Sequence, residues 1–394
     1  MRPKIAYLTG DDEADRKLSS GTVFYISQAL RKYCGDVYYI SPTNPASGVL
    51  KRLFGKTLEV LTGKRYLHTH TLSWSTKLAR SIEEKLAAGS FDLVFAPMGS
   101  TALAALETTL PIVYLSDTTT KLMLDYYPSF SNLINAHEAS DIEQRAIDKA
   151  SLLLYPSSWA ACSAQADYHA DERKIHIVPF GANIDECPAP ETLADRTRSD
   201  KCSLLFVGAD WERKGGSVAY ETLLELDRKG IPAKLTVVGS VPPKVFRHPN
   251  LEVIRFLNKN TPADRAHLNS LYLNSDFLLL PTRMDCSPIV ICEANAFGLP
   301  VIASVAGGVP EIIRDGLNGY LLPPEARGQE YASLIAKLHS NCEHYRELRR
   351  SSREQFETRL NWNVWGKAVS CLIFELLQQS EQGRSCVSQS SAVS

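Results

Sequence analysis

Several common signals of function are absent from this chain of 394 residues. The net charge is only −1, so composition gives no argument for nucleic-acid binding. No apolar run approaches the roughly 20 residues that a membrane-spanning helix needs. The nine cysteines contain no C-x-x-C pair and no zinc-finger spacing, and an odd number argues against a disulfide framework. We therefore expect a cytoplasmic protein with reduced thiols that at most rests on a membrane surface.

Other absences narrow the functional class. The start of the chain, MRPKIAYLTG, leads into a strand pattern and has no signal-peptide core. No G-x-G-x-x-G follows that strand, which disfavours a nicotinamide oxidoreductase. No Asp-x-Asp follows a strand, and the acidic cluster Asp11-Asp12-Glu13 is more typical of a solvated loop than of a metal site. We therefore expect neither a metal nor a cofactor.

What the chain does have is an alternation of short apolar runs with amphipathic segments. The strands predicted in the first half are residues 5–8, 37–40, 93–96, 112–115, 152–155 and 175–178. Those of the second half are residues 204–207, 235–238, 251–255, 277–280, 301–303 and 320–322. Helical patterns lie between them, for example residues 22–33, 75–88 and 157–169. Apolar strands separated by helices predict βαβ units in parallel sheets covered on both faces.

The chain is too long for one hydrophobic core, so we expect two domains. A polar stretch with two prolines, residues 182–201, has no clear period and is typical of a linker. The predicted division is a domain over 1–185, a linker over 186–201, a domain over 202–360, a helix over 361–379 that packs back on the first domain, and a disordered Ser-rich tail over 380–394. Two tandem α/β halves predict a ligand cleft between the carboxyl ends of their sheets.

Residues 276–324 are the most informative segment. An apolar strand, FLLLP, ends in a short polar loop that carries Asp285. Ser287 and Pro288 are predicted as the N-cap and the first residue of a helix. Glu293 lies about a turn and a half inside that helix. A carboxylate at this depth can accept hydrogen bonds from sugar hydroxyls beside a bound phosphate.

The second half of the same segment repeats the pattern. Gly298 is placed to end the helix, and a strand over residues 300–304 follows it. The Gly307-Gly308 loop then leads into a short helix from Pro310. Two strand-to-helix turns thus aim backbone N–H groups at one sheet edge, and such an edge binds phosphate well. The pattern predicts a nucleotide-sugar pocket.

Two cations belong to the same prediction. After the first strand of the second half, Arg213 and Lys214 lie beside the start of a helix near Gly215. Cations at this place can neutralise a diphosphate and support its departure as a leaving group. A solvated pair at the start of an ordinary surface helix is the alternative, but the neighbouring acidic segment favours the functional interpretation.

With these motifs the chain resembles the retaining glycosyltransferases of family 4, most strongly over residues 203–324. The resemblance implies the α/β GT-B fold, two Rossmann-like domains facing each other across a cleft. It implies transfer of a sugar from a UDP- or GDP-linked donor to an acceptor hydroxyl with retention of configuration, in polysaccharide or glycolipid synthesis. The family's two acids, separated by seven residues, are matched by Asp285, in place of the commoner Glu, and Glu293.

The resemblance also assigns roles to single residues. It implies that the sugar and phosphate site is lined by Asp285, Cys286, Ser287, Pro288 and Ile289, and that Glu293 holds the nucleotide ribose. The family lysine is matched by Lys214, whereas Ala209 stands where the usual arginine would be, so Arg213 is expected to supply that charge.

In the first half, Gly21 and Thr22 follow a long loop at the start of a helix, where a family glycine loop faces the donor. An ordinary helix start is the alternative for both. Asp117 follows the strand IVYL where many family members have a histidine. It is expected to orient the acceptor hydroxyl or bind a donor hydroxyl, and a helix N-cap is the alternative.

Two further features complete the prediction. Gly239, Leu257 and Asn258 follow apolar strands and are candidates for binding the base, with core-terminating turns as the alternative. Residues 47–66 mix lysines and arginines with leucines, which suits anionic lipid on the inner face of a membrane and a lipid-linked acceptor. A helix that packs its leucines in the first domain and solvates its lysines is the alternative.

Three other functions remain open for the same architecture. A sugar-nucleotide epimerase and a phosphorylase both occur on two such domains. A non-catalytic nucleotide-sugar-binding protein is the third, because the usual arginine and histidine are missing. The presence of Lys214, Glu293 and the Gly307-Gly308 loop argues against a decayed site.

Overall fold

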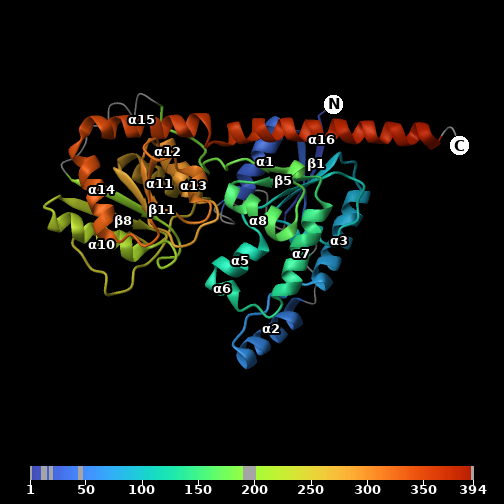
Figure 1. The fold of residues 1–394 in the computed structure, drawn as a ribbon, viewed down its shortest axis with the longest axis horizontal. Helices are drawn as coiled ribbons and strands as arrows, with labels where there is room; N and C mark the ends of the chain where they lie inside the picture. Colours follow the sequence, from blue (N-terminus) through green and yellow to red (C-terminus); the bar gives the residue numbers. More distant parts are fainter. Residues whose placement is uncertain (1, 10–15, 17–20, 43–47, 190–200, 392–394) are drawn as a thin grey trace. The chain divides into compact units, whose positions relative to one another are not determined.

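The computed structural model describes residues 2–9, 16, 21–42, 48–189 and 201–391, without the side chains of 48–52, 54 and 383–391. The chain forms two compact units. The first unit comprises the first strand, Val23–Val178 and the chain from Gly366. The second unit comprises Pro179–Trp365 together with Arg16, Gly21 and Thr22. Each unit is an α/β domain built on its own parallel sheet (Figure 1).

The described part of the first unit contains a six-stranded sheet in the order β2-β1-β3-β4-β5-β6, and every strand pair is parallel. Its strands are β1 (Lys4–Leu8), β2 (Asp36–Ile40), β3 (Leu93–Pro97), β4 (Ile112–Leu115), β5 (Leu152–Tyr155) and β6 (Ile175–Ile177). Its helices are α1 (Thr22–Tyr33), α2 (Gly48–Thr62), α3 (Leu72–Ala87), α4 (Ser100–Leu103), α5 (Thr120–Tyr126), α6 (Pro128–Ser131), α7 (Ala136–Lys149), α8 (Ser158–Tyr168), the 3-10 helix η2 (Glu172–Lys174) and the long α16 (Trp362–Ser391).

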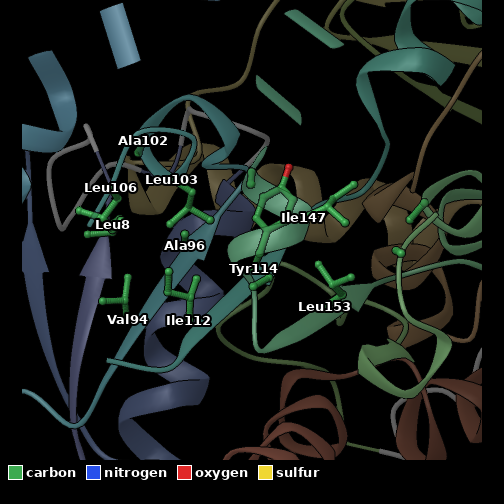
Figure 2. Packing of buried hydrophobic residues seen from close by; sticks show 14 of the residues in the cluster. Leu8, Val94, Ala96, Ala102, Leu103, Leu106, Ile112, Tyr114, Ile147 and Leu153 are labelled. Atoms are coloured by element: carbon green, nitrogen blue, oxygen red, sulfur yellow. The ribbon is translucent and has the colours of Figure 1, made fainter. Parts of the chain in front are cut away.

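The central strands of this sheet are apolar throughout because both faces are covered. Strands β3, β4 and β5 are buried at every position. One face packs under α3, α4, α7 and α8, and Figure 2 shows Leu103, Tyr114, Ile147 and Leu153 within that core. On α16, Ser370 donates a hydrogen bond to the carbonyl of Tyr33 at the end of α1.

The second unit contains a parallel sheet in the order β12-β11-β10-β7-β8-β9. Its strands are β7 (Cys202–Val207), β8 (Ala233–Val238), β9 (Leu251–Ile254), β10 (Phe277–Leu280), β11 (Val301–Ser304) and β12 (Gly319–Leu322). Its helices are α10 (Gly216–Arg228), α11 (Pro262–Asn274), α12 (Ile289–Ala296), α13 (Val309–Ile312), α14 (Gly328–Ser340) and α15 (Cys342–Thr358). One face packs against α11 and α12, and the other against α10 and α14.

Each predicted strand is present, and the helix after β10 is followed by Gly298 at a φ of 60°, as expected. The predicted boundary at residue 185 lies too late, because the second unit begins at Pro179. Phe180 and Ala182 are buried apolar residues, and the amide of Ala182 donates to the carbonyl of Leu360. The start of the predicted linker therefore belongs to the second unit, and residues 190–200 lie outside the described part of the chain.

The prediction of a disordered tail from residue 380 is wrong as far as Ser391, because α16 continues to that residue. The serines suggested disorder, but this stretch contains no proline and only one glycine to interrupt a helix that has already begun. The last three residues lie outside the described chain.

Candidate functional site

The strand order of the second unit reverses between β7 and β10. From β7 the chain proceeds to β8 and β9 on one side, and β10, β11 and β12 lie on the other. The loops after β7 and β10 therefore leave the sheet in opposite directions, and ligands bind open α/β sheets at such a switch point. Arg213 and Lys214 lie in the first loop, and Asp285 lies in the second.

The predicted cation and the predicted acid meet at this switch point. Lys214 Nζ forms an ion pair with Asp285 Oδ2, and their side chains are 12% and 10% exposed. Gly208, at the end of β7, makes room for the lysine, since a Cβ there would lie 2.9 Å from Lys214 Cγ. A largely desolvated ion pair of this kind interacts more strongly than a surface pair, because less water screens it.

A glycine permits the close approach of the two loops. Gly215, the N-cap of α10, has a φ of 78°, and a Cβ there would lie 1.9 Å from the carbonyl oxygen of Pro281. The amide of Arg283 donates to the carbonyl of Arg213 over 2.8 Å. The backbones after β7 and β10 are therefore joined directly, which fixes Lys214 relative to Asp285.

Arg213 contacts both of these loops. Its Nη1 donates to the carbonyl of Met284 over 2.8 Å. Its Nε lies 3.6 Å from Asp210 Oδ2 on its own loop. The Arg213 guanidinium thus contacts the residue before Asp285, which places its charge at the switch point beside Lys214.

Glu293 is held by two residues that sequence reasoning missed. It is 2% exposed on α12. Lys259 Nζ lies 2.6 Å from one carboxylate oxygen, and the Tyr272 hydroxyl donates to the other over 2.8 Å. Burial, and then the charge of Glu293, raise the pKa of Tyr272, so this hydroxyl remains a donor. Lys259 directly follows the predicted base-binding residues, a proximity that was the only sequence signal for it.

The start of α12 differs by one residue from the prediction. Pro288, at φ −73° and ψ 99°, is the N-cap, and Ile289 is the first helical residue. Ser287 therefore lies one residue before the N-cap and does not cap the helix. Its hydroxyl is buried without a hydrogen-bond partner among the described residues. Next to it Cys286 is buried.

A second orphaned hydroxyl follows β8. Ser240 is 5% exposed, and its Oγ has no partner within the described chain. Buried hydroxyls are normally paired, so unpaired ones that follow the ends of strands are available to a ligand. Gly239, just before it, has a φ of 92° and donates its N–H to the carbonyl of Ile254. The sequence pattern does not distinguish Ser240, because serines after strands are common.

The remaining predicted residues of this edge support neighbouring loops. Gly308 is the N-cap of the short α13, which begins at Val309, and its N–H donates to the carbonyl of Asp285 over 3.1 Å. Gly307 has a φ of 50°. The amide of Asn258 donates to Asp264 over 2.7 Å, and Leu257 packs against the core beside it. These contacts hold the Asp285 loop and the loop after β9 in place.

Gly21 and Thr22 also group with the second unit. Gly21 has a φ of 89°, a conformation that favours glycine. Thr22 is 2% exposed, and its hydroxyl accepts a hydrogen bond from the amide of Asn183 over 3.1 Å. Asn183 in turn accepts from the indole of Trp362 over 3.0 Å. The loop before Gly21 lies outside the described chain, apart from Arg16, which pairs with Asp185.

Asp117 lies in the first unit, directly after β4. The N-cap of α5 is Thr119, whose hydroxyl accepts from the amide of Leu122 over 3.3 Å. Asp117 is therefore not the N-cap of α5. It is half-buried at the carboxyl edge of the first sheet.

Comparison with known families agrees with this geometry. Residues 21–186 match the model described as Glycosyltransferase Family 4, and residues 201–341 match the model described as Glycosyl transferases group 1. The chain belongs to the family 4 glycosyltransferases.

The family 4 chain is similar in sequence to several glycosyltransferases. It is 27% identical over 221 residues to D-inositol 3-phosphate glycosyltransferase of Corynebacterium kroppenstedtii, a match of 51% of this chain and 48% of that protein. The chain thus spans about half the length of the curated relatives it matches.

Its fold is similar to that of sucrose-phosphate synthase from Thermosynechococcus elongatus, with a TM-score of 0.68 and 16% identity over 96% of this chain and all of the other. Anabaena HepE, solved in complex with UDP, has a TM-score of 0.64 at 16% identity over 95% of this chain and all of the other. The family 4 chain shares the GT-B fold of these proteins.

The described part of the family 4 chain has neither a metal-binding cluster nor a membrane-spanning helix. Its described residues include no group of three or more His, Cys, Asp or Glu side chains arranged to hold a metal ion. The acidic cluster at residues 11–13 lies outside them. No helix in the described part combines the length and apolar character needed to cross a bilayer.

Proposed function

We propose that this protein is a retaining glycosyltransferase that moves a sugar from a nucleoside-diphosphate sugar to an acceptor hydroxyl. The observation that carries the proposal is the Lys214–Asp285 ion pair at the switch point of the second sheet. A cation at a helix N-terminus suits a diphosphate, and a carboxylate beside it suits sugar hydroxyls. Family membership supports the same reaction class.

The donor is assigned to the second unit. Lys214 would exchange part of its contact with Asp285 for the diphosphate, which leaves Asp285 to accept from donor-sugar hydroxyls. Glu293 would accept from the ribose hydroxyls, with Lys259 and Tyr272 holding its carboxylate in place. The unpaired hydroxyls of Ser240 and Ser287 are further donor contacts in this proposal.

The transfer step needs no protein nucleophile. The bond between the anomeric carbon and the diphosphate oxygen breaks, while the acceptor oxygen forms its bond on the same face. The acceptor proton passes to the departing diphosphate oxygen. Lys214 and Arg213 stabilise the charge that develops there. With two cations and the start of α10 beside the phosphates, the proposal requires no metal and no other cofactor.

UDP is the first nucleotide to test, because HepE, which shares the fold, was solved with UDP and with UDP and glucose. Titration calorimetry with UDP-glucose, GDP-glucose and ADP-glucose should give heat with one of them. Loss of that heat in Glu293→Ala would place the nucleotide at α12. If none of the three bound, the donor assignment would be wrong.

Product analysis separates this proposal from its alternatives. A transferase gives a glycosylated acceptor and free nucleoside diphosphate. An epimerase would change the sugar of the donor with no acceptor present, and a phosphorylase would need phosphate and an oligosaccharide. A non-catalytic binding protein would bind the donor and release nothing.

For the acceptor we propose a lipid-linked or carbohydrate hydroxyl, on the evidence of α2. Leu53, Val60 and Leu61 lie seven and eight residues apart on one helical face and are 57%, 86% and 77% exposed. Lys56 and Lys64 are exposed on the same segment. This combination suits peripheral contact with an anionic lipid surface.

Arg65, counted among the basic residues of that segment, has a different role. Its Nη1 donates to the carbonyl of Ser129 over 3.0 Å, and its guanidinium lies 5.6 Å from the centre of the Phe130 ring. It therefore joins the end of the α2 segment to α6. Ser47 and the first side chains of α2 lie outside the described residues.

A further inference from the structure

A buried carboxylate at the carboxyl edge of the first sheet has no part in the proposed donor site. Glu143, on α7, is 3% exposed. The hydroxyl of Tyr114 donates to its Oε1 over 2.9 Å, and that of Thr120 donates to its Oε2 over 3.2 Å. The hydroxyl of Ser100 donates a third hydrogen bond. Three hydroxyls thus converge on one side chain in the interior.

The three donors come from the ends of neighbouring strands. Tyr114 belongs to β4, and its side chain lies in the core shown in Figure 2. Ser100 is the first residue of α4, which follows β3, and Thr120 is the first residue of α5, which follows β4. Glu143 therefore ties together the two loops at this edge, including the loop that carries Asp117.

The loop after β3 is also strained. Met98 has a φ of 49°, in the left-handed region that non-glycine residues rarely adopt. Its amide donates to the carbonyl of Leu115 at the end of β4 over 2.6 Å. Strain of this kind persists only where the surroundings hold the backbone in place. The contact from Ser100 to Glu143 is one of those that hold it.

On its other side the Asp117 loop contacts α8. The hydroxyls of Thr119 and Ser163 are 2.7 Å apart, and the amide of Lys121 donates to the Tyr168 hydroxyl over 2.8 Å. Both partners lie on α8, where Ser163 also donates to the carboxylate of Asp167 over 2.6 Å. The loop thus reaches a carboxylate on each side, directly at Glu143 of α7 and through Ser163 at Asp167 of α8.

The surroundings of Glu143 place its ionisation near neutrality. Burial raises the pKa of Glu143 to about 7, against the opposing effect of the three hydroxyl donors. Tyr155 on β5 and Tyr168 on α8 also face it, and its charge adds to the effect of burial in raising the pKa of both hydroxyls. Among the described residues, no lysine, arginine or histidine is one of the groups that shift the pKa of Glu143.

We propose that ionised Glu143 is a positioning residue that holds Ser100 and Thr120, and with them the Asp117 loop, in the arrangement that receives the acceptor hydroxyl. As a carboxylate it accepts from all three hydroxyls at once. As a carboxylic acid it must donate its own proton, so one of the three hydroxyls must turn from donor to acceptor. An acceptor role for Asp117, one of the two that the family resemblance implies, rests on the proposed function, whereas the coupling of Glu143 to the two loops does not.

Hydrogen exchange tests the coupling directly. Exchange is measured on wild type and on Glu143→Gln between pH 5.5 and 8.5, in peptides covering residues 98–104 and 116–126, and corrected for the intrinsic pH dependence. Wild type should gain protection in both peptides as pH rises through about 7, by roughly two- to tenfold, the effect of one hydrogen bond. Glu143→Gln should keep the low-pH level throughout.

The matched control is Asp141→Asn, the same change on the same helix at an exposed carboxylate. It should reproduce the wild-type profile. Equal protection at all pH values in wild type and Glu143→Gln would overturn the proposal. If Glu143→Gln does not fold, Thr120→Val serves instead, and it should lower protection in 116–126 at every pH while leaving 98–104 coupled to pH.

Turnover of UDP-glucose provides a second readout. Wild-type kcat should rise by roughly two- to tenfold between pH 6 and pH 8, whereas that of Glu143→Gln stays low and flat. KM for UDP-glucose should not change, because the donor is assigned to the second unit. A retained pH step in Glu143→Gln would refute the positioning role. A wild type that neither binds nor turns over UDP-, GDP- or ADP-sugars would refute the proposed function, with the exchange result still deciding the role of Glu143.

Discussion

In the second unit the strand ends bring cations and carboxylates together, whereas in the first unit they bring hydroxyls around one carboxylate. Lys214 pairs with Asp285, and Lys259 with Glu293. Glu143 has only hydroxyl donors among the described groups that shift its pKa. The two edges are built on similar parallel sheets but present different chemistry.

The two sheets also differ in strand order. The second sheet has three strands on each side of its switch point between β7 and β10. In the first sheet the reversal falls between β1 and β3, with two strands on one side and four on the other. The charged edge suits a diphosphate, which needs cations, and the hydroxyl-rich edge suits a neutral acceptor, which needs orientation.

The charged edge can be broken most severely at Lys214. In Lys214→Ala the diphosphate loses a cation that stabilises its developing charge, so kcat should fall about a hundredfold or more. Steady-state kinetics with the donor found by calorimetry measures this. Lys229→Ala removes the same charge from the other end of α10, where the side chain is exposed, and should leave kcat unchanged. Full sugar transfer by Lys214→Ala would remove the lysine from the mechanism.

The close contact between the loops after β7 and β10 can be disrupted at Gly215. A Cβ there overlaps the carbonyl of Pro281, and the φ of 78° disfavours any side chain. Gly215→Ala should lower the free energy of unfolding by about 2–3 kcal/mol. Gly230→Ala is the matched control, with a φ of 70° and open space around the Cβ, and should cost about 1 kcal/mol. Chemical denaturation compares them, and equal losses would show that the loop contact contributes nothing.

In the first unit, the exposed apolar face of α2 can be tested for contact with lipid. Replacing Val60 and Leu61 by serine removes apolar surface that is already exposed, so folding should be unaffected. Sedimentation with phosphatidylglycerol vesicles should show about tenfold weaker binding. Val241→Ser with Val245→Ser makes the same kind of change at exposed residues of the second unit and should have no effect. Equal vesicle binding by both double variants and wild type would rule out α2 as the contact.

The pH dependence of stability gives the smallest expected effect. The folded-state pKa of Glu143 is raised to about 7 from 4.5, so the folded protein holds a proton that the unfolded chain loses. This contribution is full below about pH 4.5, falls as pH rises towards 7 and is absent above it. Glu143→Gln lacks it, so its Tm relative to wild type should rise by about a few degrees across that window. A constant Tm difference would mean that Glu143 does not titrate there.

The predicted strands and the convergence of Lys214 with Asp285 came from local information. Each strand is a short apolar run bounded by polar residues, and strands buried on both faces have that signature. The loops after parallel strands share one edge, so residues at those loops were expected to meet. The ion pair of Lys214 with Asp285 follows from that rule.

The residues that were missed act through contacts distant in sequence. Tyr272 reaches Glu293 from α11, and Tyr114 reaches Glu143 from β4. Neither tyrosine differs in local pattern from an ordinary core residue. The expected helix start at Pro288 is a local error of one residue, so Ser287 is not the N-cap, and its hydroxyl has no partner among the described residues.

By itself the sequence determined the two α/β units, their strands and the loops that carry polar residues, because apolar periodicity and turn chemistry act over a few neighbouring residues. Only the tertiary structure decided which side chains contact the buried carboxylates of Glu293 and Glu143. Lys259 opposite Glu293, and three hydroxyls around Glu143, are set by packing between helices and strands that the chain brings together from far apart. Burial in that packing is also what moves the ionisation of Glu143 towards neutral pH, since a charge loses its water there.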